Sequence, residues 1–248
     1  MSGRGAAGGG PRPGGHRPRP RSGADRSLAA YRALIAERGG LFSNPPGRIF
    51  EILTSGKDIR RAQQAAKKAR LQHGLSATDL RVGVLLEDPY LLVMRDAVRF
   101  PDGQVGLYNR IVAPPNVVVL PALGDRVALI YRFRHGTRSF HYEAPRGVAS
   151  GPDPYEDDAR RELAEEIGAE AAELIDLGEL HPYSGICNEI MRLYFARINS
   201  IGEPDLHESI ARITLFSARK LEQAIAGGAI TDAPTLAATL RARLRGLL

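Results

Sequence analysis

Four carboxylates between Asp158 and Glu166 are spaced so that a helix would bring them together. Asp158, Glu162 and Glu166 are four residues apart, and Glu165 follows Glu162 by three. Because a helix turns about every 3.6 residues, these side chains would crowd neighbouring faces within two turns. Like charges at this spacing repel, so the face is either fully solvated or neutralised by cations. Oxygen ligands with no histidine nearby suit Mg²⁺ or Mn²⁺ rather than zinc.

The apolar residues of the same segment predict that it is a helix from about Tyr155 to Ile167. Ala159, Leu163 and Ile167 recur every fourth residue and form the expected buried stripe. On composition alone, a solvated charged helix is the simpler interpretation of the acidic face. The flanking residues favour the metal site instead.

The stretch from Gly147 to Ala169 resembles the Nudix hydrolase box, G-x(5)-E-x(7)-R-E-U-x-E-E-x-G-U, in which U is bulky and apolar. The matching positions are Gly147, Arg161, Glu162, Leu163, Glu165, Glu166 and Gly168. Asp153 replaces a glutamate of the pattern, and its shorter reach would weaken a structural salt bridge there. Ala169 is a small version of the last apolar residue. Neither departure falls on Glu162, Glu165 or Glu166.

The resemblance implies an α/β (α+β) fold, an α/β/α sandwich with a mixed sheet in which the box is a loop–helix–loop. It also implies that divalent metal is bound by Glu162, Glu165 and Glu166, helped by the main-chain carbonyl of Arg146. Mg²⁺ is the expected ion, with Mn²⁺ as the alternative, and Glu165 and Glu166 are expected to serve catalysis. The positions expected to keep the motif in shape are Gly147, Asp153, Arg161 and Gly168.

The physical chemistry of diphosphate cleavage agrees with such a site. A diphosphate is anionic and repels a nucleophile, so cations must neutralise its oxygens, and they can acidify the attacking water. In-line displacement at phosphorus demands positioned charge more than a covalent nucleophile. Cys187 is a poor alternative nucleophile because no histidine is obviously placed to activate it.

Motifs outside the box narrow the substrate. Over roughly 82–245 the chain follows the order of motifs in ADP-ribose and related sugar-nucleotide pyrophosphatases. Those proteins usually carry E-x-P-A-G where this chain has residues 143–147, so Arg146 replaces a small residue. Ser184 falls where their S-P-G loop has the proline that marks ADP-ribose specificity. The particular sugar therefore stays open.

The same resemblance suggests substrate-binding residues. Arg134 is expected to contact substrate phosphate or sugar, with a solvent-exposed strand end as the alternative. Arg132, two residues away, would face the same side and is the second candidate. Glu189 either binds substrate or orients loops, or merely pairs with Arg192.

A catalytic base is expected outside the box. Glu208 lies in the loop where the relatives carry their catalytic glutamate, and Glu203 or Asp205 are its alternatives. A mobile loop suits a base that must approach only a bound substrate. A plain polar loop is the other interpretation.

The sequence therefore predicts Mg²⁺-dependent hydrolysis of the diphosphate of ADP-ribose or a related nucleoside-diphosphate sugar, giving a nucleoside monophosphate and a sugar phosphate. The first alternative is another Nudix substrate, such as a dinucleoside polyphosphate, coenzyme A or capped RNA. The second is a catalytically silent domain that senses nucleotides. The complete set of metal glutamates argues against silence.

The elements before this domain differ in composition. Residues 1–27 are rich in Gly, Pro and Arg, and six arginines against one acid there account for five of the six net positive charges. We predict a disordered tail, either a solvated leader or a weak nucleic-acid contact. Residues 28–78 are predicted to be a helical region, with a capping box at Ser55 and Asp58 before a helix to about His73.

Strands are predicted after this helical region. Residues 79–115 would be the N-terminal strands of the hydrolase and a dimerisation element, and 116–248 the Nudix domain. The expected strands are 81–86, 91–100, 105–112, 117–121, 127–133, 174–180, 191–198 and 212–215, with a hairpin turn at 101–103. Two helices, 218–226 and 233–244, would close the chain, the second capped by Thr231 or Asp232.

Location and assembly are also predicted. The single cysteine, Cys187, excludes an internal disulfide and suits a reducing compartment. No apolar run approaches the roughly 20 residues that span a bilayer, and the N-terminus has no secretory apolar stretch. We expect a cytoplasmic protein without a membrane partner. By the resemblance, it would be a homodimer in which N-terminal strands help to shape the partner's site.

Overall fold

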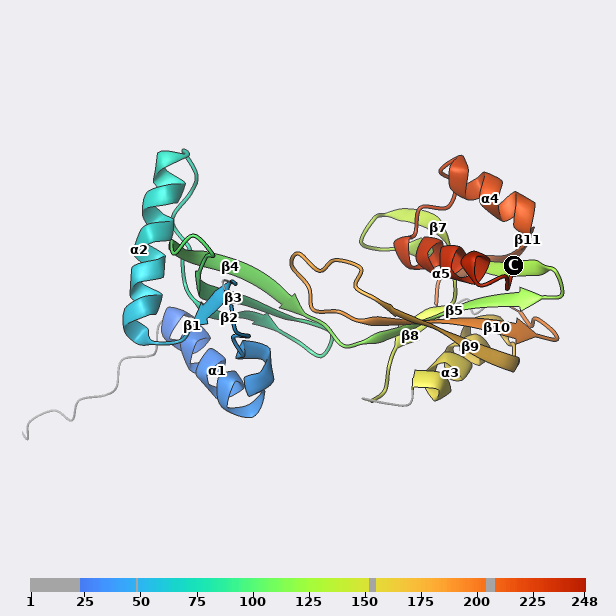
Figure 1. Ribbon diagram of the computed structural model, residues 1–248, viewed down its shortest axis with the longest axis horizontal. Coiled ribbons are helices and arrows are strands. Elements are labelled where there is room, and N and C mark those ends of the chain that lie inside the picture. The colour runs from blue at the N-terminus through green and yellow to red at the C-terminus, as the bar shows by residue number, and fades with distance from the viewer. Residues whose placement is uncertain (1–22, 48, 152–154, 204–207) are drawn as a thin grey trace, which may run out of the picture.

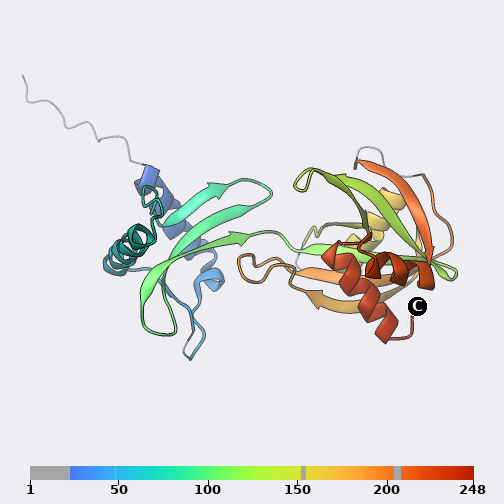
Figure 2. The same ribbon diagram turned by 90° about the horizontal axis from the view of Figure 1, so that it is seen from above.

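The computed structural model describes residues 23–47, 49–151, 155–203 and 208–248. Two units follow one another along the chain and are joined at residues 113–115 (Figures 1 and 2). Within the described residues, the first unit has a sheet of four strands and the second a sheet of seven. No helix in this part of the chain is long and apolar enough to cross a membrane.

The first unit is built around strand β3 (Leu92–Arg99). This strand pairs antiparallel with β4 (Val105–Val112) along one edge, and with β1 (Glu51–Leu53) and β2 (Gly83–Glu87) along the other. Helix α1 (Gly23–Glu37) packs against β2, and α2 (Gly56–Gln72) against β3 and β4. A 3₁₀ turn, η1 (Gly39–Phe42), follows α1.

A buried polar network fixes α1 on this sheet. The Tyr31 hydroxyl, fully buried, donates a hydrogen bond to the Asp96 carboxylate. Arg110 neutralises that carboxylate with its Nε 2.6 Å from Oδ2, and its Nη1 donates to the Leu41 carbonyl at 2.6 Å. Burial and the nearby Asp96 charge raise the pKa of Tyr31. The hydroxyl therefore stays a donor, and each buried charge has a partner.

The structure corrects two predictions for the N-terminal region. Residues 23–27, predicted to be disordered, belong to α1, because the buried Ser27 donates from Oγ to the Val84 carbonyl at 2.6 Å. The rest of the predicted tail, 1–22, lies outside the described residues. Residues 28–78 are not purely helical either, since β1 pairs with β3. A three-residue strand shows no periodicity, so only its partner reveals it.

Other local predictions for this unit are confirmed. Ser55 caps α2 by accepting from the Asp58 amide at 3.1 Å. The turn at 101–103 is present, with Gly103 at a φ of 86° and its amide 2.8 Å from the Phe100 carbonyl. The strands predicted at 81–86, 91–100 and 105–112 correspond to β2, β3 and β4. They form one sheet with β1 rather than joining the second sheet.

The second unit contains the predicted mixed sheet. Its strand order is β11-β6-β5-β10-β9, with β7 on β6 and β8 on β5. Strand β10 runs parallel to β5, and the remaining pairs are antiparallel. The bounds are β5 (Asn116–Leu123), β6 (Arg126–Arg134), β7 (Ser139–Glu143), β8 (Arg146–Val148), β9 (Ala171–Leu180), β10 (Met191–Ile198) and β11 (Ile210–Ser217).

Helices cover both faces of this sheet, which confirms the α/β/α sandwich (Figure 1). On one face, α3 (Tyr155–Ile167) packs its apolar stripe against Val117 and Val119 of β5. On the other face, α4 (Ala218–Ala226) and α5 (Ala233–Leu244) cover Val118 and Leu120. Alternate residues of one strand therefore serve two cores, as the two-residue period requires. The three helices have their predicted bounds.

Two short strands beside the functional segment were not predicted. Strands β7 and β8 have five and three residues, and their pairing with β6 and β5 makes them strands. Asp232, one of the two predicted caps, caps α5 by accepting from the Thr235 amide at 3.1 Å. Gly168 directly follows the last residue of α3, and its φ is 59°. A Cβ built there would lie 3.0 Å from the Cα of Gly202, so both the conformation and the space favour glycine.

Candidate active site

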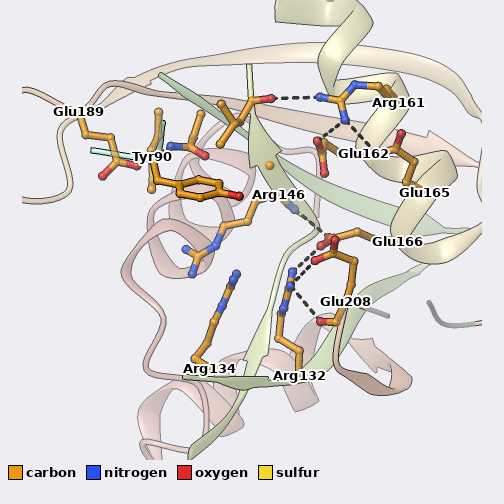
Figure 3. Close-up of a pocket in the computed structure, with 14 residues that line it drawn as sticks. Tyr90, Arg132, Arg134, Arg146, Arg161, Glu162, Glu165, Glu166, Glu189 and Glu208 are labelled. Carbon is orange, nitrogen blue, oxygen red and sulfur yellow. Dashed lines mark hydrogen bonds and ion pairs between the residues drawn. The ribbon is translucent and has the colours of Figure 1, made fainter. Parts of the chain in front are cut away.

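A cavity of about 840 Å³ lies where α3, β6 and β8 meet (Figure 3). Carboxylates of α3 form one side of it, and arginines of β6 and β8 form the other. The lining residues are Tyr90, Asn116, Arg132, Arg134, Arg146, Gly147, Val148, Arg161, Glu162, Glu165, Glu166, Glu189, Met191 and Glu208. Most predicted site residues are therefore brought together here. Gly168 is at the end of α3, outside the lining, and Asp153 lies outside the described residues.

Three glutamates of α3 reach the cavity to different depths. Glu166 and Glu162 are buried, whereas the side chain of Glu165 is 55% exposed. Arg161 bridges two of them, with Nη1 2.7 Å from Glu162 Oε1 and 2.8 Å from Glu165 Oε2. Repulsion on this face is thus offset by a guanidinium of the same helix.

Asp158, the fourth carboxylate of the helix, does not line the cavity. Its oxygens accept from the amide and hydroxyl of Ser150 at 3.0 and 2.7 Å, and from Arg161 at 3.2 Å. Burial raises the pKa of Asp158, but these hydrogen bonds outweigh it and hold the pKa below its usual range. Asp158 therefore fixes the loop before α3 instead of joining the glutamates.

Glu166 is the most deeply buried carboxylate of the wall, with 2% of its surface exposed. Its Oε1 is paired with the Arg132 guanidinium, and its Oε2 accepts from the Arg146 amide at 3.0 Å. Burial nevertheless raises its pKa from 4.5 to about 7, because these partners offset only part of the lost hydration. Such a carboxylate gains from an additional cation.

The backbone of β8 leaves room for the second buried glutamate. A Cβ built on Gly147 would lie 2.1 Å from Oε1 of Glu162, so the carboxylate occupies the space that any side chain at 147 would fill. Within the described residues, no three carboxylates form a group that could hold a metal ion as they are placed, and Arg132 and Arg161 are the cations paired with these glutamates. The oxygen donors and the glycine cradle fit a hard divalent cation.

The opposite wall is basic because alternate residues of β6 point into the cavity. Arg134 donates to the buried Glu143 of β7, with Nε 2.9 Å and Nη2 2.5 Å from Oε2. The Arg146 side chain lies between Glu143, at 3.2 Å, and Asp232, at 3.0 Å. Both guanidinium groups are thus held in place while they line the cavity.

Glu189 lines the cavity within reach of the Arg146 charge. It accepts from Asn116 Nδ2 at 2.7 Å, and burial raises its pKa. The alternative of a Glu189–Arg192 pair is wrong, since Arg192 pairs with Asp176 and Glu179 across the β9–β10 ladder. Position on neighbouring strands decides this pairing, not distance along the sequence.

Glu208 reaches the cavity from the residues just before β11. Its carboxylate accepts from Arg132 Nη2 at 2.8 Å. Of the two alternatives for a base, Glu203 does not line this cavity, and Asp205 lies outside the described residues.

Several lining residues were not predicted from the sequence. Tyr90 comes from the turn between β2 and β3 in the first unit, and 78% of its surface is exposed (Figure 3). Asn116 and Met191 are the first residues of β5 and β10, which run parallel. No local motif marks any of these positions. Glu143, by contrast, belongs to the segment compared with E-x-P-A-G, which could have marked it as a site residue, although its pairing with Arg134 comes from the contact of β6 with β7.

Comparisons with known proteins agree with this geometry. The family model described as NUDIX domain matches residues 112–238. The ADP-ribose pyrophosphatase of Mycobacterium tuberculosis (strain ATCC 25618 / H37Rv) is 30% identical over 126 residues, which are 49% of this chain and 60% of that protein. The match thus spans less than two thirds of that relative. A solved structure of an "ADP compounds hydrolase" has a TM-score of 0.59 at 20% identity, covering 67% of this chain and 92% of the other. This likeness shows the fold.

The cradle at Gly147 predicts a defect in metal binding. In Gly147→Ala, the new methyl would displace the Glu162 carboxylate, and we expect Mn²⁺ affinity to fall by about tenfold or more. Titration calorimetry measures the affinity. Gly136→Ala is the matched control, because no atom lies within 4 Å of a Cβ built there. Equal affinity in the two variants would contradict the prediction.

The burial of Glu166 predicts a pH-dependent stability difference in metal-free protein. The pKa of Glu166 is about 7 in the folded protein and 4.5 in the unfolded chain, so the unfolded chain loses the proton at lower pH. The free energy of unfolding therefore falls as the pH rises from about 4.5 to about 7. Glutamine at 166 carries no such proton, so in chelator the free energy of unfolding of Glu166→Gln relative to the parent should rise by up to about 3 kcal/mol between pH 5 and pH 8. Denaturant unfolding measures this. A difference in unfolding free energy that does not change with pH would disprove it.

Proposed function

This chain belongs to the Nudix family, and we propose that it hydrolyses the diphosphate linkage of ADP-ribose or a related nucleoside-diphosphate sugar. The products would be a nucleoside monophosphate and a sugar phosphate. The names of the two similar proteins, an ADP-ribose pyrophosphatase and an ADP compounds hydrolase, support a nucleoside-diphosphate substrate.

One observation carries the proposal: the cavity has an acidic wall and a basic wall facing one another. A divalent cation would be held by Glu162, Glu165, Glu166 and the Arg146 carbonyl, with Mg²⁺ expected and Mn²⁺ as the alternative. When bound, it would neutralise phosphate oxygens and lower the pKa of the attacking water. An anionic diphosphate between the two walls would meet positive charge on both sides.

The protein's own groups would position the substrate. Arg134 is 29% exposed at its side chain and keeps N–H groups toward the cavity, so it suits a phosphate oxygen. Because Glu143 holds it rigidly, little entropy is lost when it binds. Glu208 is half exposed beside the metal glutamates, which suits it to take the proton from the attacking water.

The finer expectations from the sequence remain proposals. The sugar is open, and a dinucleoside polyphosphate, coenzyme A or capped RNA are alternatives. A cytoplasmic location and a weak nucleic-acid contact of the basic tail are also proposals. For the homodimer, sedimentation equilibrium of the full chain is the test, and a monomer at micromolar concentration would contradict it.

Release of AMP from ADP-ribose tests the function. With Mg²⁺, the protein should turn over ADP-ribose, and Glu165→Gln and Glu166→Gln should each lower kcat by about a hundredfold or more, because metal ligands stabilise charge in the transition state. Chromatography of AMP and ribose 5-phosphate measures the reaction.

Glu170→Gln is the matched control, since Glu170 is exposed just beyond α3 and does not line the cavity. It should retain parental activity. Tight binding of ADP-ribose without turnover of any nucleotide sugar would disprove hydrolysis and identify a nucleotide-sensing domain instead.

A further inference from the structure

We propose that Arg132 is a positioning residue, which holds Glu208 in the cavity and ties it to Glu166. The inference rests on the proposed function and assigns Arg132 a different task from the substrate contact predicted from the sequence. It concerns a contact that joins the segment before β11 to the metal-binding helix.

Both terminal nitrogens of the Arg132 guanidinium contact protein groups. Its side chain is 6% exposed, and Nη1 is paired with Glu166. Nη2 donates to the Glu208 carboxylate at 2.8 Å and to the Glu208 main-chain carbonyl at 3.0 Å. Few N–H groups of this guanidinium are therefore left to contact a substrate. Arg134, two residues along the same strand, is 29% exposed at its side chain and pairs with Glu143 instead.

Glu208 depends on this contact for its place. Its side chain is 53% exposed, and its next neighbour, Ser209, has a left-handed φ of 58°, which is uncommon for a residue other than glycine. The Ser209 carbonyl accepts from the Phe133 amide at 3.1 Å, and the β11–β6 pairing then shifts register between Ile210 and Arg212. The chain thus turns sharply at the point where Glu208 meets Arg132.

A planar guanidinium suits this bridge because its N–H groups diverge toward two acceptors at once. A lysine ammonium at 132 keeps the charge next to Glu166 but is a single point donor. The exposed Glu208 would then lose its fixed orientation, and a base that samples many orientations transfers protons less efficiently. Loss of Arg132 should therefore lower kcat, whereas loss of a substrate contact would raise KM.

A double-mutant cycle on kcat distinguishes these roles. With ADP-ribose and Mg²⁺, Arg132→Lys and Glu208→Gln should each lower kcat by about tenfold or more, with KM changed less than about twofold. The double variant should be no slower than Glu208→Gln alone, because both changes remove one function. The proposal would be overturned if the fold-losses in kcat of Arg132→Lys and Glu208→Gln multiplied in the double variant. A rise in KM confined to Arg132→Lys, or an unchanged kcat in Glu208→Gln, would also overturn it.

The matched control is Arg134→Lys, because Arg134 contacts Glu143 and not Glu208. When Arg134→Lys is combined with Glu208→Gln, the fold-losses in kcat of the two single variants should multiply. A structural role for Arg132 would lower thermal stability without producing non-additive kcat values, so melting curves of all variants accompany the kinetics.

A measurement that needs no turnover keeps the inference separate from the proposed function. Hydrogen exchange of residues 208–217, followed by mass spectrometry, should be faster in Arg132→Lys than in the parent and unchanged in Arg134→Lys. Unchanged exchange in both variants would overturn the positioning role. If the parent releases no AMP, the proposed function fails, while the exchange result still decides whether Arg132 holds this segment.

Discussion

Burial of carboxylates beside a sheet is the constraint on which this site depends. Glu143, Glu162 and Glu166 are each at most 7% exposed, and a buried charge without a partner would cost several kcal/mol. Each therefore contacts an arginine: Arg134, Arg161 and Arg132, respectively. Two of these guanidinium groups, those of Arg132 and Arg134, also belong to the basic wall, so the same ion pairs stabilise the buried carboxylates and set the charge of the cavity.

The layers of the second unit give these charges a fixed geometry. Val117 and Val119 hold the apolar stripe of α3, which sets the height of the glutamates above β5. The alternation of β6 sends Arg132 and Arg134 into the cavity, while Tyr131 stacks with Phe140 on the other face. Helix and strand periodicity together thus align an acidic wall with a basic one, although the two are far apart in the sequence.

Local patterns explain which parts of this arrangement were predictable. The helix at Tyr155–Ile167 followed from spacing over a few residues, as did the cap at Ser55. The resemblance to the Nudix box, and not the spacing, singled out Glu162, Glu165 and Glu166 among its carboxylates. The same spacing could not show that Asp158 would turn to Ser150, because that depends on the path of the preceding loop. Strands β1, β7 and β8, the pairing of Arg192 with Asp176 and the Glu143–Arg134 pair all arise from sheet contacts that no single segment encodes.

The first unit contributes to the cavity through contacts within one chain. Ile111 of β4 exchanges hydrogen bonds with the segment before Glu189, its amide 2.7 Å from the Ile186 carbonyl and its carbonyl 3.2 Å from the Asn188 amide. The Tyr108 hydroxyl donates to the Gly185 carbonyl at 2.6 Å. These bonds hold the loop that carries Glu189 against β4, and the same unit extends Tyr90 to the cavity. Glu189 and Tyr90 therefore reach the site in a single copy of the chain, and a second copy is not needed to place either of them.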